Sequence, residues 1–347
     1  MVRKLLSNPW VATSLSVLIL GLVVLFAGFS GVIDLSPSAV FSHLAGHDAL
    51  TSREQAIFFD IRLPRIITGV IVGATLALSG AAYQAVFRNP LADPYLLGVS
   101  AGAGLGVTIV IVGGTVLGLS TNNVGVIGAA FVGGVAAVLA TLLVSRGVGQ
   151  GSSTTVVILA GVAVAAFASS VQTYIQQRHI DTVAQIYIWM LGNLNVTNWT
   201  SISVVAAVSG LCAGVIIACA RLLDVMAVGD IEARTLGVDP SIVRIAIVLV
   251  ATMSTAAVVS ISGLIGFVGI IVPHALRLIV GPGHRMLLPL SLVWGAIFLV
   301  LADTVGRTLM APQELPVGVV TAAVGAPFFL FILRRTSRPR VRHRGED

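Results

Sequence analysis

The sequence predicts an all-α polytopic membrane protein with about ten transmembrane helices. Hydrophobic residues make up 56% of the 347 residues, charged residues make up 10%, and the mean hydropathy is +1.02. Soluble globular chains carry about 25% charged residues, so this chain must be solvated largely by lipid. The apolar residues gather into ten stretches, each near the roughly 20 residues that a helix needs to cross a bilayer. We therefore treat residues 1–347 as a single transmembrane domain.

These ten stretches are predicted to be helices because lipid offers backbone groups no hydrogen-bond partners. In chain order they cover about residues 10–29, 66–87, 96–117, 123–145, 155–176, 199–220, 242–260, 263–280, 287–308 and 316–334. The first imitates a signal peptide, but it is long enough to span and no small-residue cleavage pattern follows it. The seventh and eighth form one long apolar region that is interrupted only at Ser260, Ser262 and Gly263.

The positive charges predict that the N- and C-termini are cytoplasmic. Ten spans place both ends on one side, and alternate assignment of the loops gives that side fifteen of the 20 Lys and Arg residues. The other five are Arg53, Arg62, Arg65, Arg178 and Arg307. Because cytoplasmic loops carry the excess of Lys and Arg, we expect the basic tail at 335–347 to be cytoplasmic.

Three connecting segments are more than simple turns. On the external side, residues 28–61 form a polar segment with room for a short surface helix. Residues 176–199, also external, enclose an apolar run at 185–192 that is too short to span and is expected to be re-entrant or interfacial. On the cytoplasmic side, residues 221–241 have the composition of a water-facing docking surface made of short polar helices.

Small residues recur at helical spacing in several spans, as in Gly69 with Gly73 and in Gly98, Gly102 and Gly106. Such spacing lets helices approach closely. Two interpretations stay open, namely tight packing within one bundle and a sliding interface at a dimer contact or pathway.

The sequence also excludes several kinds of chemistry. Lys4 is the only lysine, and a phosphate-binding loop needs a lysine after its glycines, so this chain does not hydrolyse ATP in that manner. A His-Glu-x-x-His zinc motif is absent, and His43 and His47 lie in a loop without a nearby Glu, so no metal site is expected.

Two ionisable residues within spans are open to an ion-coupled reading, because such groups often bind a coupling ion. Asp303 lies four residues before Arg307, so an ion pair on one helix face is the simpler explanation. His274 lies near the cytoplasmic end of its span, where capping or packing is the simpler role.

Six blocks along the chain carry a joint pattern that is far more specific than a generic polytopic one. They are Arg62 to Arg65, Gly73 to Gly80, Gln84 to Ala103, Gly229 to Gly237, Gly263 to Arg277, and Glu314 to Pro327. In composition and order they resemble the permease subunits of ABC importers for ferric siderophores, haem and cobalamin, of the type II importer class. The resemblance covers nearly the whole chain.

The resemblance implies a homodimer with the translocation pathway at the dimer axis, a pair of cytoplasmic ABC ATPase subunits, and an external or periplasmic substrate-binding protein. ATP and magnesium would be used by the ATPase, so this chain would be a non-catalytic subunit without a bound cofactor or metal. Its expected place is the bacterial cytoplasmic (inner) membrane, as a multi-pass protein that contacts lipid and no nucleic acid.

The expected function is to move an iron chelate, a ferric siderophore, from the binding protein into the cytoplasm. Cobalamin or haem is the alternative cargo of the same type of importer, and an ion-coupled secondary transporter is the remote alternative. The sequence does not select the cargo, because a weakly binding pathway carries little chemical signature.

The resemblance also assigns roles to three groups of residues. The binding protein would dock on Arg62, Arg65 and Arg307, since guanidinium groups pair bidentately with carboxylates. The ATPase would couple to Asp230, Glu232, Ala233, Arg234, Leu236 and Gly237. The gate would consist of Asn89, Pro90, Leu91, Ser152, Ser153, Thr154 and Thr155. Three alternatives stay open, namely interfacial anchoring by Arg62 and Arg65, pairing of Arg307 with Asp303, and simple helix capping by residues 152–155.

Overall fold

The protein is all-helical in the part of the chain that the structure describes. The computed structural model describes residues 9–31, 33–47, 49–118, 123–147, 154–196 and 198–336. Within these ranges every regular element is a helix and there is no strand. Eight helices are long and apolar enough to cross a membrane, and two shorter apolar helices bring the predicted spans to ten. The predicted fold class is confirmed.

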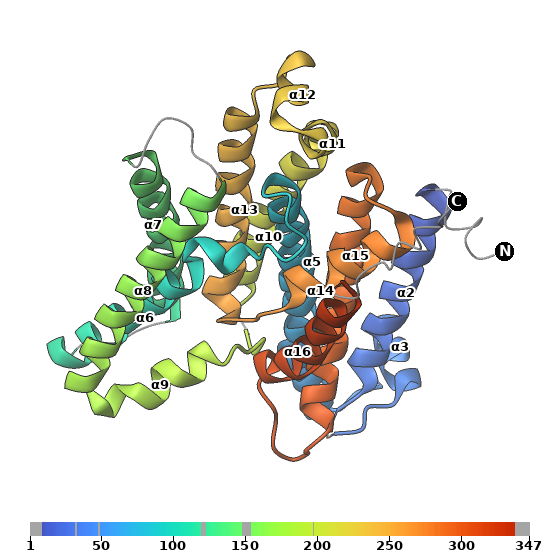
Figure 1. The fold of residues 1–347 in the computed structure, drawn as a ribbon. Coiled ribbons are helices and arrows are strands. Elements are labelled where there is room, and N and C mark those ends of the chain that lie inside the picture. The colour runs from blue at the N-terminus through green and yellow to red at the C-terminus, as the bar shows by residue number, and fades with distance from the viewer. Residues whose placement is uncertain are drawn as a thin grey trace.

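Ten helices correspond to the predicted spans, and Figure 1 shows their arrangement in one bundle. They are α2 (Pro9–Phe29), α5 (Leu63–Val86), α6 (Val99–Leu117), α7 (Asn123–Gly147), α8 (Thr154–Arg178), α10 (Trp199–Ala218), α13 (Pro240–Ser262), α14 (Val268–Val280), α15 (His284–Thr308) and α16 (Val317–Thr336). The apolar pattern therefore located each of these helices, and only the eighth begins clearly later than predicted, at Val268.

Helix α5 lies at the centre of the bundle. Its apolar window is 83% buried, whereas that of α2 is 22% buried, and α5 packs against α13, α14 and α15. Gly73 of α5 faces Gly295 of α15 so closely that a Cβ on either residue would collide with the carbonyl oxygen of the other. Gly102 of α6 and Gly133 of α7 face each other in the same way. At these positions the glycine spacing serves packing within the bundle.

The seventh and eighth spans are separated by a stretch of irregular backbone. Helix α13 runs on to Ser262, the chain turns through Gly263 with φ +68° and Phe267 with φ +69°, and α14 begins one residue later. The predicted interruption is confirmed, but it is longer than expected. Helix α14 has 13 residues, too few to cross a bilayer alone. Irregular backbone at membrane depth must be covered by protein, and Asn193 supplies part of that cover by donating its N–H to the Ser262 carbonyl at 2.8 Å.

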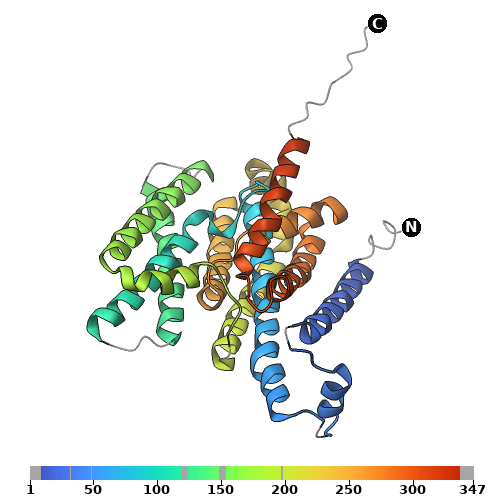
Figure 2. The same cartoon turned by 90° about the horizontal axis from the view of Figure 1, so that it is seen from below.

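The short helices lie in the connecting segments where the sequence has polar residues. The segment between α2 and α5 forms α3 (Pro37–Leu44), α4 (Ser52–Gln55) and the π-helix η1 (Ala56–Arg62), and Figure 2 shows this segment at the edge of the bundle. Helix α9 (Ile180–Met190) has 11 residues and lies across one end of the bundle. At the opposite end Figure 1 shows α11 (Ala220–Val228) and α12 (Asp230–Thr235).

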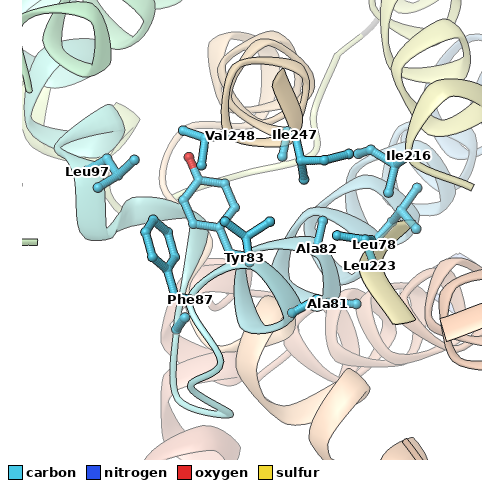
Figure 3. Packing of buried hydrophobic residues seen from close by; sticks show 14 of the residues in the cluster. Leu78, Ala81, Ala82, Tyr83, Phe87, Leu97, Ile216, Leu223, Ile247 and Val248 are labelled. Atoms are coloured by element: carbon cyan, nitrogen blue, oxygen red, sulfur yellow. The ribbon is translucent and has the colours of Figure 1, made fainter. Parts of the chain in front are cut away.

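A buried cluster anchors the α11 end of the molecule. Figure 3 shows Tyr83 of α5 packed among side chains from α10, α11 and α13. The Tyr83 hydroxyl is 2.8 Å from the hydroxyl of Thr252 on α13, which satisfies the only polar atom of this buried ring. Leu223 of α11 is fully buried in the same cluster. The short helix α11 is thereby fixed to the central helix.

Candidate functional site

The helices α11 and α12 form a hairpin that projects apolar side chains from the end of the bundle. Helix α11 buries Ala220, Leu223 and Met226, which are spaced by three residues and lie on one helix face. The opposite surface of the hairpin exposes Val228, Ile231 and Leu236, which are 69%, 76% and 65% accessible. Three exposed apolar side chains flanked by charged residues are typical of a protein docking surface.

The predicted coupling residues divide into two sets in this hairpin. The side chains of Glu232, Arg234 and Leu236 are exposed, and Gly237, also exposed, closes α12 with φ +79°. Ala233 is fully buried and fixes α12 to the bundle. The Asp230 side chain is 45% exposed but is engaged by two arginines of the chain, so Glu232, Arg234 and Leu236 are the side chains most open to a partner.

Asp230 is held by two arginines from other elements. Its carboxylate forms an ion pair with Arg88, which follows α5, and a second with Arg244 of α13 at 3.2 Å. Asp224 of α11 makes a further tie, because its Oδ1 accepts the backbone N–H of His284 at 2.8 Å and lies 2.7 Å from the His284 ring nitrogen. The hairpin is therefore tied to α5, α13 and α15 at once.

Asp239 follows the hairpin and is the N-cap of α13. Asp239 accepts hydrogen bonds from the Ser241 hydroxyl at 2.6 Å and the Ser241 backbone N–H at 2.9 Å. These hydrogen bonds hold the pKa of Asp239 below its ordinary value. Asp239 thus stays ionised as the N-cap, where a negative charge complements the helix dipole.

The predicted gate residues are partly outside the described ranges. Ser152 and Ser153 lie outside them, and Thr154 and Thr155 open α8. Asn89, Pro90 and Leu91 form a tight turn after α5, in which the Asn89 side chain accepts the Leu91 N–H at 3.0 Å. Nothing in the structure tests the gate role of either group, which stays a prediction.

Helix α8 carries an exposed polar stripe that the sequence reading missed. The stripe consists of Ser169, Ser170, Thr173, Tyr174 and Gln177, and these residues line an open hollow on the surface. The hydroxyls of Ser170 and Thr173 donate to helix carbonyls four residues earlier, at 2.8 and 2.9 Å. Only a helical-wheel view of this span could have revealed the stripe, because hydroxyl residues hardly lower the mean hydropathy of a long apolar segment.

The three arginines predicted to dock a binding protein are buried. Arg62, Arg65 and Arg307 are 5%, 7% and 5% exposed. Arg65 donates to both carboxylate oxygens of Asp303, at 2.9 to 3.1 Å, and to Glu314 at 2.8 Å. The Arg307 Nε atom lies 3.0 Å from Oδ2 of the same carboxylate. The predicted pair of Asp303 and Arg307 on one helix face is therefore present.

Arg62 and Arg307 also close the end of α2. Arg62 donates to the carbonyls of Gly28 and Ile33, and Arg307 donates to Ala27 at 3.3 Å and Ser30 at 3.3 Å. The last carbonyls of a helix lack partners within the helix, and cations suit that end. The expected outward-facing arginine surface is therefore an internal cluster here, and a docking role requires that an external carboxylate displaces one of its present partners.

The comparison with protein families identifies the class of this chain. Residues 17–335 match the family model described as the FecCD transport family. The chain belongs to the FecCD transport family. The resemblance drawn from the sequence blocks is confirmed, and the chain is a multi-pass permease of a transport system.

FecCD relatives match along most of their length. The cobalamin import system permease protein BtuC of Halobacterium salinarum is 42% identical over 283 residues, which cover 81% of this chain and 74% of that protein. The hemin transport system permease protein HmuU of Yersinia pestis is 38% identical over 291 residues, covering 82% and 85%. A solved metal-chelate type ABC transporter in an inward-facing conformation is 29% identical, covers 93% of this chain and 99% of its own, and gives a TM-score of 0.82.

For this FecCD permease, sequence reasoning missed several partners within the chain. Glu314 opens one of the sequence blocks and Asp224 lies in the polar segment 221–241, but neither pattern indicates what these residues contact. Their partners lie 249 and 60 residues away in sequence. No local pattern reports such contacts, because they depend on which helices lie side by side.

Proposed function

We propose that this chain is the transmembrane permease subunit of an ATP-driven importer that moves a metal chelate into the cytoplasm. ATP is hydrolysed by a separate pair of cytoplasmic ABC ATPase subunits, and an external binding protein delivers the cargo. The chain works as a homodimer in the bacterial cytoplasmic membrane, with both termini and the α11–α12 hairpin on the cytoplasmic side.

The α11–α12 hairpin is the observation that carries this proposal. It lies at the end of a membrane-spanning bundle and exposes Val228, Ile231 and Leu236 beside Glu232 and Arg234. Apolar side chains at the centre and charges at the rim are the usual composition of a protein interface. A soluble motor subunit with a complementary groove fits this surface, and the short helices can carry its movement into the bundle through their ties to three spans.

The polar stripe of α8 supports a homodimer with the pathway between the two copies. On a single copy this stripe is exposed along a span. The Ser170 and Thr173 hydroxyls donate to carbonyls of their own helix, but lipid would offer the Gln177 amide no water to hydrogen-bond. A second copy facing α8 encloses the stripe in a water-filled space. Hydroxyl groups make weak, reversible contacts, which suits a pathway that must release a bulky cargo.

Within the class of metal chelates, a ferric siderophore is the cargo expected from the resemblance. Cobalamin is the second candidate, because a 42% identical relative is named a cobalamin import permease, and haem is the third, from the hemin permease of Yersinia pestis. All three are large metal–organic complexes, so one wide and weakly binding pathway serves any of them.

The ion pairs of Asp303 argue against an ion-coupled carrier. Asp303 is contacted by both Arg65 and Arg307, which neutralise its charge and occupy its oxygens. A coupling-ion site needs a carboxylate that is free to bind and release the ion.

The test is ATP-dependent uptake in liposomes that hold this chain, the ATPase encoded beside it and the matching binding protein, with ferric siderophores, cobalamin and haem offered separately. We expect uptake of one cargo that needs both partners. The double variant Glu232→Ala, Arg234→Ala should lower uptake per ATP hydrolysed, whereas Arg53→Ala, which removes an exposed charge from α4, should not. Uptake driven by an ion gradient without the ATPase would refute the proposal.

A further inference from the structure

The residue that ends helix α5 has a backbone conformation that does not suit it. Arg88 has φ +47°, in the left-handed region where a Cβ is strained and glycine is the usual choice. The Arg88 N–H donates to Ala85 at 3.2 Å and the Asn89 N–H donates to Gln84 at 3.1 Å. This pair of bonds is the Schellman helix ending, whose left-handed position is usually a glycine. An arginine at this position indicates that its side chain is needed.

The Arg88 side chain reaches the hairpin predicted to contact the ATPase. Its guanidinium forms the ion pair with Asp230, the first residue of α12. Arg244 of α13 donates to both oxygens of the same carboxylate, at 3.3 and 3.2 Å. The side chain of Arg244 is 11% exposed and that of Arg88 is 38% exposed, so Arg244 is the fixed support and Arg88 is the link at the surface.

The segment after Arg88 is a series of short, rigid turns. The Asn89 side chain and carbonyl accept the N–H groups of Leu91 and Ala92, both at 3.0 Å. Asp93 then caps the 3-10 turn η2 (Pro94–Leu97) by accepting the Tyr95 N–H at 2.7 Å. Because hydrogen bonds close each turn, we expect the segment to move as a unit when one end is displaced.

The far end of this segment touches the irregular backbone between α13 and α14. The Tyr95 hydroxyl donates to the Ile265 carbonyl at 3.2 Å and accepts the Ile265 N–H at 3.3 Å. A continuous set of contacts therefore joins Asp230 on α12, through Arg88 and residues 89–95, to the interruption at 263–267. The other inward tie of the hairpin, from Asp224 to His284, ends on α15 and does not reach this segment.

We propose that Arg88 is a positioning residue that transmits movement of α12 to the 89–91 turn through its ion pair with Asp230. The proposal rests on the importer function argued above and adds to it one residue outside the predicted coupling and gate sets. Contacts in series do not by themselves establish energetic coupling. The proposal therefore needs a variant that removes the side chain without harming the fold.

Arg88→Gly is that variant, because glycine relieves the strained backbone while it removes the guanidinium. A half-exposed ion pair adds little to stability, so the melting temperature of Arg88→Gly should equal or exceed that of the unmodified protein. Uptake per ATP hydrolysed in the liposome assay should fall about tenfold, within the usual range of coupling between sites. Arg88→Lys, which keeps a positive charge, should restore part of the loss.

Two further variants separate transmission from simple anchoring. Asp230→Asn should lower uptake per ATP hydrolysed as Arg88→Gly does. The variant that carries both changes should lose no more than either single variant, because each change removes the same ion pair. Arg244→Gln should have a clearly smaller effect, since Arg244 does not lead to the 89–91 turn.

If Arg88→Gly left uptake per ATP hydrolysed unchanged, the proposal would be overturned. It would also be overturned if Arg244→Gln lowered uptake per ATP as much as Arg88→Gly does, because Asp230 would then only anchor α12. If the unmodified complex showed no ATP-dependent uptake, the importer function would fail and this proposal with it. If the unmodified complex took up cargo and Arg88→Gly had the same uptake per ATP hydrolysed, only the Arg88 proposal would be refuted.

Discussion

At the scale of single residues, the cluster around Asp303 joins the start of α5 to the end of α15. Asp303 and the arginines beside it lie within the bundle, where a lone charge is costly and a paired one is tolerated. Two guanidinium groups share one carboxylate, and the excess positive charge is balanced by Glu314 and by the carbonyls at the end of α2. The cluster is a complete structural unit before any partner binds.

Removal of the shared carboxylate should destabilise the fold. Asp303→Asn leaves Arg65 and Arg307 buried without the charge between them, and breaking such a pair typically costs about 3–5 kcal/mol. Glu314→Gln is the matched control, because its side chain is 42% exposed and its loss should cost at most about 1 kcal/mol. Thermal unfolding in detergent would measure both, and equal losses would contradict the assignment of Asp303 as the central charge.

Glu314 also competes with any external acid for Arg65. If a binding protein docks through Arg65, as the resemblance implies, its carboxylate must take the place of Glu314 on the Arg65 Nη1 atom. Glu314→Gln should therefore strengthen binding of that protein by several-fold, since exposed charge pairs contribute up to about 1 kcal/mol. Titration of labelled binding protein onto reconstituted permease would measure the change, and weaker binding would exclude Arg65 as the docking group.

At the scale of elements, the spans were predictable and their contacts were not. Lipid requires long apolar runs, so α2, α7 and α10 follow directly from composition. Gly263 indicated the interruption between the seventh and eighth spans, but nothing in the sequence indicated that it extends to residue 267. Its length depends on the left-handed conformation of Phe267, which no residue propensity predicts. The buried state of Arg62 was equally hidden, because it depends on the end of α2 being beside it.

The exposed face of α12 should determine ATPase binding. Ile231→Glu places a charge at the most exposed of the three apolar side chains of the hairpin and should weaken association with the ATPase by about thirtyfold, the effect of an interface hot spot. Leu44→Glu makes the same change on α3, which is also exposed, at the opposite end of the bundle, and should leave association unaltered. Co-purification at a series of salt concentrations would compare them, and equal retention of the ATPase by both variants would count against the hairpin as the docking site.

At the scale of the whole molecule, the distribution of polar groups indicates which faces meet lipid. Helix α10 exposes Val204, Leu211 and Val215, which suits hydrocarbon. Helix α8 exposes Ser169, Ser170 and Thr173 on its C-terminal half and Leu159 and Val162 on its N-terminal half. Because the exposed side chains change from apolar to polar along one span, we expect the two halves of α8 to meet different surroundings in the assembled transporter.

Accessibility to water would therefore distinguish the pathway from the lipid surface. In a background with Cys212→Ala and Cys219→Ala, which removes both native thiols, Ser170→Cys should react with a membrane-impermeant thiol reagent, because only the thiolate reacts and it forms only where water reaches. Leu211→Cys, at a position that is 74% exposed on α10, should not react, since lipid surrounds it. Added binding protein and ATP should change the rate at residue 170 alone, because only a pathway opens and closes with the cycle. If residue 170 resisted the reagent in every state while the protein still transported cargo, the α8 stripe would lie against protein rather than water, and the pathway would have to be sought on another face.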